Sequence, residues 1–399
     1  MKRLNTTWRS ALFATPGDGA ITVVITGLFL WAAWAFLHWA IYSAKWLVLR
    51  ANAATLTIGR YPEAQEWRLW LLLGMVVSLT GLSWGLLRGA GRWPRNDRLA
   101  ALLLTAVTLV LPASLAFGPA NQLRLLLLLL LLLALRWIGG SFSAAAAMQR
   151  WRRWWGLVWG VAYGLGLWLI AGGLGLPGVR PSDWGGLMFT LLITSLTLLL
   201  AFPLGVLLAL GRRSSLPLFR WVCVGVIELV RGAPLITLLF LGQNLVGFLA
   251  PNGLAPDRVW RATGVLTVFA AAYLAEAIRG GLAAIPRGQA EAARSLGLST
   301  PQSLAFVVMP QALRLALPTL VGQCIALLQD TTLLSIIGLF DLLGIARSVL
   351  SNPDWLGRYA EVYLLLAVLY WCSCSALSLG SRALEQRLNS SAHTSPART

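Results

Sequence analysis

Apolar segments long enough to cross a lipid bilayer recur along this chain and constrain its fold more than any other feature. An unbroken run of leucine, Leu125 to Leu133, lies inside one of them. A helix needs roughly 20 apolar residues to cross the hydrocarbon core, and the chain has about ten such segments. Hydrophobic residues make up 58% of the sequence and charged residues 12%, about half the charged share of soluble domains. We therefore expect an all-α membrane protein with about ten transmembrane helices.

The expected spans lie near residues 21–44, 69–88, 99–118, 123–139, 156–176, 187–210, 220–250, 261–282, 313–340 and 361–383. The first is longer than the apolar region of a signal peptide, so we interpret it as an uncleaved span. With the N-terminus in the cytoplasm, the inside loops and tails contain nineteen lysine and arginine residues and the outside loops ten. The positive-inside rule favours this arrangement, which places both termini in the cytoplasm.

The net charge of +18 admits two interpretations. Excess arginine can follow a nucleic-acid backbone, but here the basic residues are scattered in short loops, where they set membrane orientation. The only lysines, Lys2 and Lys45, lie outside any glycine-rich loop, so no phosphate-binding loop of the Walker type is expected. Cys372 and Cys374 lack metal-ligand spacing and a nearby histidine. We expect no bound cofactor, no metal site and no enzymatic activity in this chain.

The composition divides the chain unevenly. Residues 1–183 are rich in leucine and tryptophan, contain about five expected helices and are interpreted as a packing and anchoring region. Residues 184–385 contain the intramembrane acids, the interrupted spans and a polar loop, and residues 386–399 form a polar tail that we expect in the cytoplasm. Function is therefore expected to lie in the second region.

Acidic residues interrupt three of the expected spans. Glu228 and Arg231 are three residues apart, as are Glu276 and Arg279, so each pair shares a helix face. Asp330 and its neighbour Thr331 interrupt the ninth span. A charge at the centre of a membrane helix costs roughly 2.5–3.5 kcal/mol on insertion scales, so such side chains face a cavity or another helix. Two interpretations stay open for these six residues: interhelical pairing, or a polar translocation path for a zwitterionic solute.

Proline lies inside several of these segments. Pro203, Pro234 and Pro318 each remove a backbone donor and loosen the helix locally. The segment 220–250 is too long for one span and contains Arg231-Gly232-Ala233-Pro234, so we expect a break there. Such breaks either expose helix ends to a substrate or are packing kinks, and the sequence leaves both open.

A polar segment between the eighth and ninth spans is expected to form two short helices on the cytoplasmic side. The first covers about Arg287 to Leu296, and Gly297 supplies the left-handed residue that ends such helices. Ser299 then begins a capping box, and Pro310 is expected to limit the second helix. The small side chains of Ala292 and Ala293 would allow close approach to a groove on a soluble partner. The alternative is an ordinary amphipathic helix at the membrane surface.

This segment resembles the coupling loop of permease subunits of ATP-binding-cassette (ABC) importers. The family pattern is Glu-Ala-Ala, three residues, Gly, nine residues and Ile-x-Leu-Pro. Here it reads Glu291-Ala292-Ala293, Gly297 and Val307-Val308-Met309-Pro310, with conservative changes in the last part. The resemblance implies that the ATPase-coupling positions are Glu291, Ala292, Ala293, Arg294, Gly297 and Pro310.

Three further stretches resemble the polar amino-acid branch of these permeases, which handles His, Glu/Gln, Arg and opine-type solutes. They are Glu228-Leu-Val-Arg-Gly-Ala-Pro-Leu235, Ala272-Tyr-Leu-Ala-Glu276 with Arg279-Gly-Gly281, and Pro310-Gln-Ala-Leu-Arg314 with Pro318. The stretch Asp330-Thr-Thr-Leu-Leu-Ser-Ile-Ile-Gly338 also resembles the fourth core helix of that branch. The resemblance covers roughly 184–385 and implies a five-helix type I importer core. The additional N-terminal helices are similar to those of the larger general L-amino-acid permease subunits.

The function that the resemblance implies is the permease subunit of an importer for polar or general L-amino acids in the bacterial inner membrane. Its implied partners are a cytoplasmic ABC ATPase dimer, a homologous second permease subunit and a periplasmic amino-acid-binding protein. The alternative is an ion-coupled secondary amino-acid transporter or channel that acts without an ATPase. Intramembrane acids fit this alternative too, but it gives no reason for the Glu-Ala-Ala segment.

Overall fold

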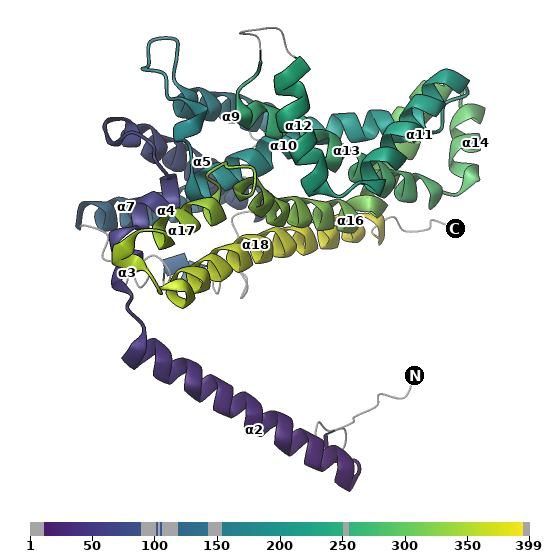
Figure 1. Cartoon of the computed structure of the whole chain (residues 1–399). Helices are drawn as coiled ribbons and strands as arrows, with labels where there is room; N and C mark the ends of the chain where they lie inside the picture. Colours follow the sequence, from purple (N-terminus) through teal and green to yellow (C-terminus); the bar gives the residue numbers. More distant parts are fainter. Residues whose placement is uncertain are drawn as a thin grey trace. The chain divides into compact units, whose positions relative to one another are not determined.

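The computed structural model describes residues 12–88, 101–102, 104–105, 119–142, 154–249 and 255–393, and most of them are helical (Figure 1). Seven of the described helices are long and apolar enough to cross a bilayer, and one bent pair of helices meets the same criterion together. Every expected span contains a helix except the one near 99–118, which lies almost wholly outside the described residues. The expectation of an all-α membrane fold is confirmed.

By its internal packing the chain forms two units, residues 1–48 and 49–399. The first contains α2 (Pro16–His38), which runs on into the π-helix η1 (Trp39–Ser43), and α3 (Leu47–Ala51) crosses the boundary between the units. Thr15 caps α2, because its hydroxyl oxygen accepts a hydrogen bond from the Asp18 amide at 3.1 Å. The expected divisions after residues 183 and 385 stay predictions; the helix that precedes the second one continues to His393.

Two N-terminal helices of the second unit, α5 (Glu66–Arg88) and α7 (Pro119–Phe142), pack closely through glycine. A Cβ atom on Gly139 of α7 would lie 2.7 Å from the Leu82 carbonyl oxygen, and one on Gly85 would meet the α7 backbone. Small residues allow membrane helices this close approach. The short apolar helix α9 (Trp155–Ala171) joins them, because the indoles of Trp155 and Trp159 donate to the Ser83 hydroxyl at 2.8 and 3.1 Å.

Four long helices form the C-terminal half: α10 (Gly186–Gly211), α13 (Arg258–Ala283), α16 (Met309–Asp330) and α18 (Tyr359–His393) (Figure 1). Gly205 of α10 lies against Leu274 of α13, and Gly281 of α13 lies against Ala312 of α16. Three buried threonines satisfy their hydroxyls within their own helices: Thr194, Thr263 and Thr267 each donate to the carbonyl four residues earlier, at 2.8, 2.8 and 2.7 Å. Both expected internal prolines, Pro203 and Pro318, are accommodated inside helices.

The expected break in the seventh span is confirmed. The segment forms α11 (Pro217–Gly232) and α12 (Leu235–Leu249), which meet at an angle of 110°. Ala233 between them is extended, and Pro234, without an N–H, begins the new direction. We call the end of the unit that contains Arg212 and the C-terminus of α13 the inner end, because the arginine distribution places it in the cytoplasm.

At the opposite, outer end, α4 (Ala53–Ile58) packs on the start of α10 and on α17 (Leu342–Leu350). Gly59 has a φ of 69° and touches Gly185 so closely that a Cβ atom at position 59 would overlap the Gly185 backbone. Only glycine fits both conditions. Short 3₁₀ turns complete this part of the chain: η2 (Glu63–Gln65), η4 (Pro181–Asp183) and η7 (Pro353–Trp355).

Asp341 begins α17 and is fully buried. Its carboxylate accepts hydrogen bonds from the amides of Leu343 and Gly344 at 3.1 and 3.0 Å, which makes it the N-cap of that helix. The Thr190 hydroxyl of α10 accepts from the Leu342 amide at 3.0 Å and ties the same turn to the core. Burial raises the pKa of Asp341 to about 7, against the lowering effect of the two amides and Arg347.

Candidate functional site

The polar segment after α13 forms a helix with a complete C-terminal cap. Helix α14 (Arg287–Ser295) is followed by Gly297 with a φ of 82°. The Gly297 amide donates to the Arg294 carbonyl at 2.9 Å, and the Leu298 amide donates to the Ala293 carbonyl at 3.2 Å. These two bonds define a Schellman motif. The predicted helix and its glycine stop are both confirmed.

The exposure of α14 separates its residues into two faces. Glu291, Ala292 and Arg294 are exposed, and so is Leu296 just beyond the helix at 84%. Ala293 is only 4% exposed. The expectation that Ala292 and Ala293 both present small side chains to a partner is therefore wrong for Ala293, whose small size instead lets α14 pack on its own chain. Gly297 faces open space, since a Cβ atom there would meet nothing within 4 Å.

The second predicted helix does not stop at Pro310. Helix α15 (Thr300–Ser303) runs through the π-helix η5 (Leu304–Val308) directly into α16, in which Pro310 occupies the first turn. A π-turn widens the backbone at the place where the proline ring would otherwise clash with the preceding turn. The beginning of the helix was predicted correctly: the Gln302 side chain accepts from the Ser299 amide at 2.9 Å. Gln311 connects the two parts, donating to Gln289 at 3.2 Å.

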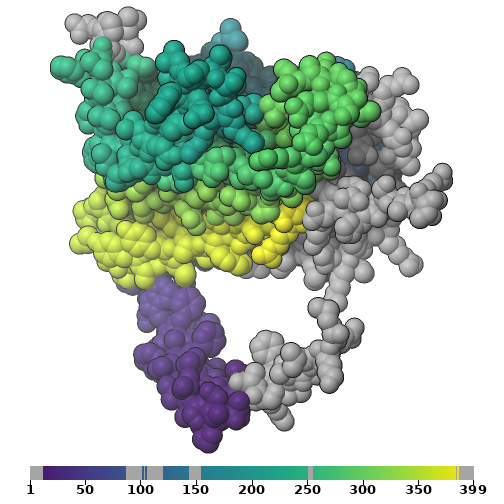
Figure 2. Space-filling view, turned by 90° about the vertical axis from the view of Figure 1, so that its right-hand side faces the viewer, coloured from purple at the N-terminus to yellow at the C-terminus, as the bar shows by residue number. Residues whose placement is uncertain are grey.

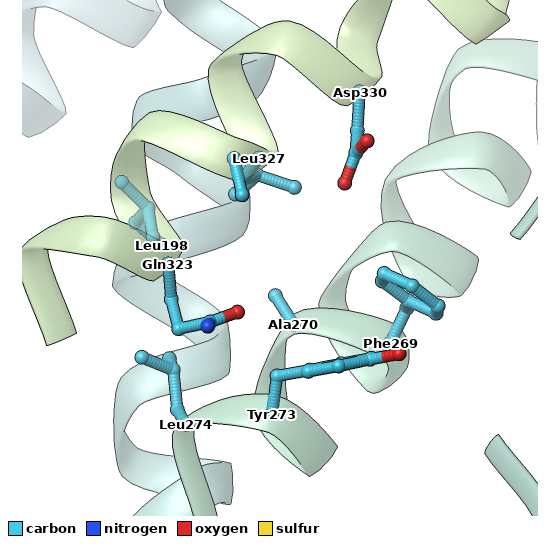
Figure 3. Close-up of a pocket in the computed structure, with 9 residues that line it drawn as sticks. Leu198, Phe269, Ala270, Tyr273, Leu274, Gln323, Leu327 and Asp330 are labelled. Atoms are coloured by element: carbon cyan, nitrogen blue, oxygen red, sulfur yellow. The ribbon is translucent and has the colours of Figure 1, made fainter. Parts of the chain in front are cut away.

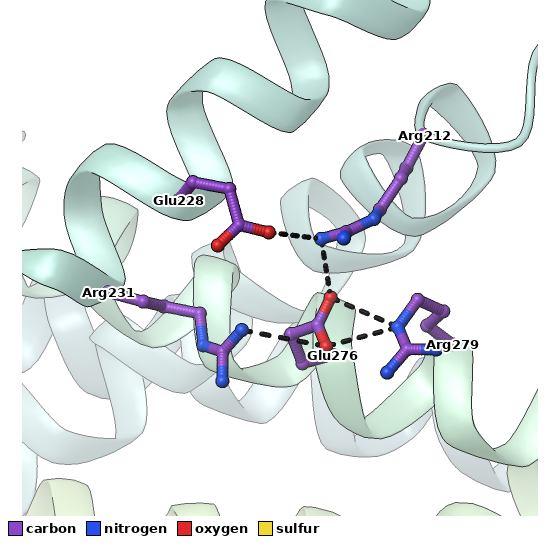
Figure 4. A network of polar contacts seen from close by, with 5 residues as sticks. All are labelled: Arg212, Glu228, Arg231, Glu276 and Arg279. Atoms are coloured by element: carbon purple, nitrogen blue, oxygen red, sulfur yellow. Dashed lines mark hydrogen bonds and ion pairs between the residues drawn. The ribbon is translucent and has the colours of Figure 1, made fainter.

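A network of charged side chains lies at the inner end, where α10, α11 and α13 meet (Figure 4). Glu276 of α13 is at its centre. Its carboxylate contacts the guanidinium groups of Arg212, Arg231 and Arg279 at 2.8, 3.5 and 3.0 Å. Arg212 also binds Glu228 at 2.9 Å. One carboxylate thus joins three arginines, one just after α10, one in α11 and one in its own helix α13.

Sequence reasoning identified four of these five residues and missed Arg212. The i,i+3 pair of Glu276 and Arg279 is confirmed, but the expected pairing of Glu228 with Arg231 is wrong. Glu228 instead binds Arg212, which follows α10, and Arg231 turns to Glu276. The spacing of residues along one helix reveals local pairs, whereas Arg212 becomes a partner only through the packing of α10 against α13. For Glu228, Arg231 and Glu276 the structure supports interhelical pairing, whereas Arg279 pairs within its own helix α13.

Asp330 lies elsewhere, in a narrow pocket between α10, α13 and α16 (Figure 3). Its carboxylate points into the pocket, as does the amide of Gln323, and the ring of Tyr273 forms one wall. Tyr273 also connects the pocket with the charged network, because the Arg231 guanidinium lies 5.4 Å from its ring centroid. Tyr273 is therefore shared by the pocket and the charged network.

Thr331 is not part of this pocket. It is fully buried and its hydroxyl donates to the Leu328 carbonyl at 2.6 Å, where α16 passes into the 3₁₀ helix η6 (Thr331–Ser335). The predicted interruption after Asp330 is thus confirmed, and Thr331 stabilises it locally. Within the described part of the chain, no group of three or more His, Cys, Asp or Glu side chains is arranged to hold a metal ion.

Comparison with known proteins identifies the family. Residues 201–390 match the family described as "Binding-protein-dependent transport system inner membrane component". The "Glutamate/glutamine/aspartate/asparagine transport system permease protein BztC" of Rhodobacter capsulatus is 36% identical over 373 residues, which are 86% of this chain and 79% of that protein. The chain belongs to this family of ABC transporter permeases. It is a multi-pass protein of the bacterial inner membrane.

Two other relatives differ in how much of the chain they match. The "Inner membrane amino-acid ABC transporter permease protein YhdY" of Escherichia coli is 44% identical over 233 residues, 58% of this chain and 64% of that protein. The "Probable glutamine ABC transporter permease protein GlnP" of Bacillus subtilis is 36% identical over 205 residues, 51% of this chain and 92% of that protein. Nearly all of GlnP is thus matched by about half of this chain, whereas the similarity to BztC covers 86% of the chain and therefore extends into residues 1–183.

Proposed function

We propose that this chain is a permease subunit of an ABC importer for amino acids and that it forms the translocation path with a second, homologous permease subunit. The observation that carries the proposal is α14, a short capped helix at the inner end whose Glu291, Ala292 and Arg294 are exposed. The relatives that match this chain are named as amino-acid permeases, which supports the substrate class.

In this proposal α14 and the residues up to Gly297 are the coupling segment, which binds a separate cytoplasmic ATPase dimer. ATP binding closes the ATPase dimer, draws the coupling segments of the two permeases together and opens the path outward, where a periplasmic amino-acid-binding protein delivers solute. Hydrolysis returns the path to the inward state. The ATP-bound ATPase dimer binds the outward state of the permease more tightly than the inward state, and this difference in affinity shifts the equilibrium between the two states.

The pocket of Tyr273, Gln323 and Asp330 is the proposed part of the path in this subunit. An amino acid carries an ammonium group and a carboxylate, and the pocket offers an anionic oxygen, an amide and an aromatic ring. The side chains of Arg231 and Glu276 lie between this pocket and the cytoplasm. Of the candidates from the sequence, Asp330 is thus assigned to the path, and Glu228 and Arg279 to pairing.

Membrane vesicles with the ATPase, both permeases and the binding protein distinguish this function from an ion-coupled transporter. We expect uptake to stop when the phosphate-binding lysine of the ATPase is replaced. Uptake that continues unchanged, and that collapses with the ion gradient, would establish the alternative.

The coupling segment is tested by the substitution Glu291→Lys. Because Glu291 is exposed on α14 and outside the bilayer, we expect insertion to be unchanged and the ATPase to copurify with the permease at a much lower yield. Glu63→Lys makes the same charge change at an exposed residue of η2 and serves as the control. An undiminished yield of ATPase with Glu291→Lys would remove α14 from the coupling interface.

A further inference from the structure

Helix α11 has an exposed apolar stripe on the side away from the core. Leu218, Trp221, Val222 and Leu229 are 79, 73, 55 and 74% exposed, and their spacing places them on one face of the helix. Cys223, Ile227 and Val230 face the core and are buried. The space-filling view of this side shows the teal surface of α11 open to the surroundings (Figure 2). An exposed apolar stripe beside a charged flank is typical of an amphipathic helix at a membrane interface.

The direction of α11 places it at the membrane surface rather than across the bilayer. Its first turns meet the end of α10, where Phe219 and Cys223 approach Gly211, and its last turn meets α13 through Arg231 and Glu276. It therefore crosses from one helix to the next. By contrast α12 follows α13 in the opposite direction, with Gly242 against Val265. Because α11 and α12 differ by 110° in direction, α11 lies close to the plane of the membrane when α12 crosses it.

Two exposed arginines, Arg213 and Arg220, stand at the start of α11. Among the residues that the structure describes, neither has an ion-pair partner, unlike the neighbouring Arg212. Trp221 beside them is of the type that anchors helices at the membrane–water boundary. The cytoplasmic leaflet carries anionic lipids that attract basic residues near its surface. The two arginines and the apolar stripe are thus complementary to one kind of surface, an anionic lipid leaflet.

We propose that α11 is embedded in the cytoplasmic leaflet, with its apolar stripe among the acyl chains and Arg213 and Arg220 bound to anionic phospholipid headgroups. The charged flank of the helix binds the network through Glu228 and Arg231. The lipid surface is thereby connected to the inner end of the proposed path. This placement depends on the geometry of α11 and not on the transport function.

A fluorescent label at Leu218→Cys tests the proposal in the full-length chain. Cys324, Cys372 and Cys374 are replaced by alanine, and the buried Cys223 is kept. The chain is placed in lipid nanodiscs, and quenching by brominated phosphatidylglycerol is compared with quenching by brominated phosphatidylcholine at equal mole fractions. We expect the anionic lipid to quench more strongly. Each of the substitutions Arg213→Gln and Arg220→Gln should lower the binding of phosphatidylglycerol relative to phosphatidylcholine about fivefold.

The controls separate charge, position and folding. Replacing both arginines by lysine restores the preference, because it keeps the charge. Arg180→Gln, an exposed arginine at the outer end, leaves it unchanged, and a label at Leu296→Cys is quenched by neither lipid. Equal quenching by both lipids would overturn the headgroup assignment, and no quenching at residue 218 would overturn the membrane placement. Quenching that disappears when the second permease binds would show that a protein covers this stripe.

Discussion

The inner and outer ends of the second unit are stabilised by different kinds of contact. At the inner end, Gly281 also touches the Ala312 backbone, but long side chains meet across helices through ion pairs, and Gly297 stands in open space. At the outer end, backbone lies against backbone at Gly59 and Gly185, and the acidic side chain of Asp341 is fully buried. Adaptable side-chain contacts are thus concentrated at the inner end, among α10, α11 and α13, whereas the contacts at the outer end are rigid.

This difference indicates which end can change its arrangement at low cost. Partly exposed ion pairs contribute little net free energy, because water replaces the partner when the pair opens. When close-packed backbone segments separate, water does not replace the lost contacts in this way, because the two surfaces fit each other in only one arrangement. We infer that the inner end rearranges between states, whereas the outer end, where α4 joins α10 and α17, moves as one body.

The largest effect should come from Gly59→Ala at the outer end. The methyl group requires both a strained positive φ and a collision with the Gly185 backbone. Strain and overpacking together should lower the free energy of unfolding by about 3 kcal/mol or more. Denaturant unfolding of the purified chain in detergent measures it. Gly173→Ala is the matched control, because Gly173 also has a positive φ but an open surrounding; equal losses would show that the contact with Gly185 does not matter.

At the inner end, Glu276→Gln should have the next largest effect. It removes the charge that Arg212, Arg231 and Arg279 share, and the Glu276 side chain is 16% exposed. Because these arginines remain partly in water, the loss should be about 2 kcal/mol, below the range for fully buried pairs. Glu228→Gln, at a side chain 55% exposed, should cost much less. Similar losses in thermal unfolding for the two variants would contradict the central position of Glu276.

The loss in free energy of unfolding should be smaller again for Asp341→Ala, about 1–2 kcal/mol, because this substitution removes the N-cap of α17. Asp341→Asn keeps an acceptor oxygen for one of the two amides, Leu343 or Gly344, and should lose less stability than Asp341→Ala. Burial raises the pKa of Asp341 from 3.8 to about 7, so its favourable contribution is full below about pH 4 and is lost as the pH rises through 7. The unfolding free energy of the wild type should therefore fall over this range relative to Asp341→Asn. Parallel pH profiles would show that Asp341 does not titrate in this way.

The features of the fold and the site that the sequence predicts are those formed by residues close together in the chain; contacts between distant residues were missed. The helices, the break at Pro234 and the stop at Gly297 are local properties of composition, proline and glycine, and they were predicted. Arg212 was missed because its partners Glu228 and Glu276 are 16 and 64 residues away in the chain. Pro310 was misjudged because a π-turn, which has no sequence signal of its own here, absorbs the proline within a continuous helix.

The smallest effect on stability should come from Gly297→Ala at the inner end, and it completes the comparison with Gly59. Both glycines have a positive φ, but a methyl group at residue 297 meets no other atom within 4 Å. Only the conformational strain remains, about 1 kcal/mol, and Gly297→Asn should cost still less because asparagine adopts this conformation more readily. Thermal unfolding of the two variants beside Gly59→Ala measures the difference between strain and collision. If Gly297→Ala instead unfolds as easily as Gly59→Ala, the inner end is as tightly constrained as the outer end, and the idea that it rearranges is wrong.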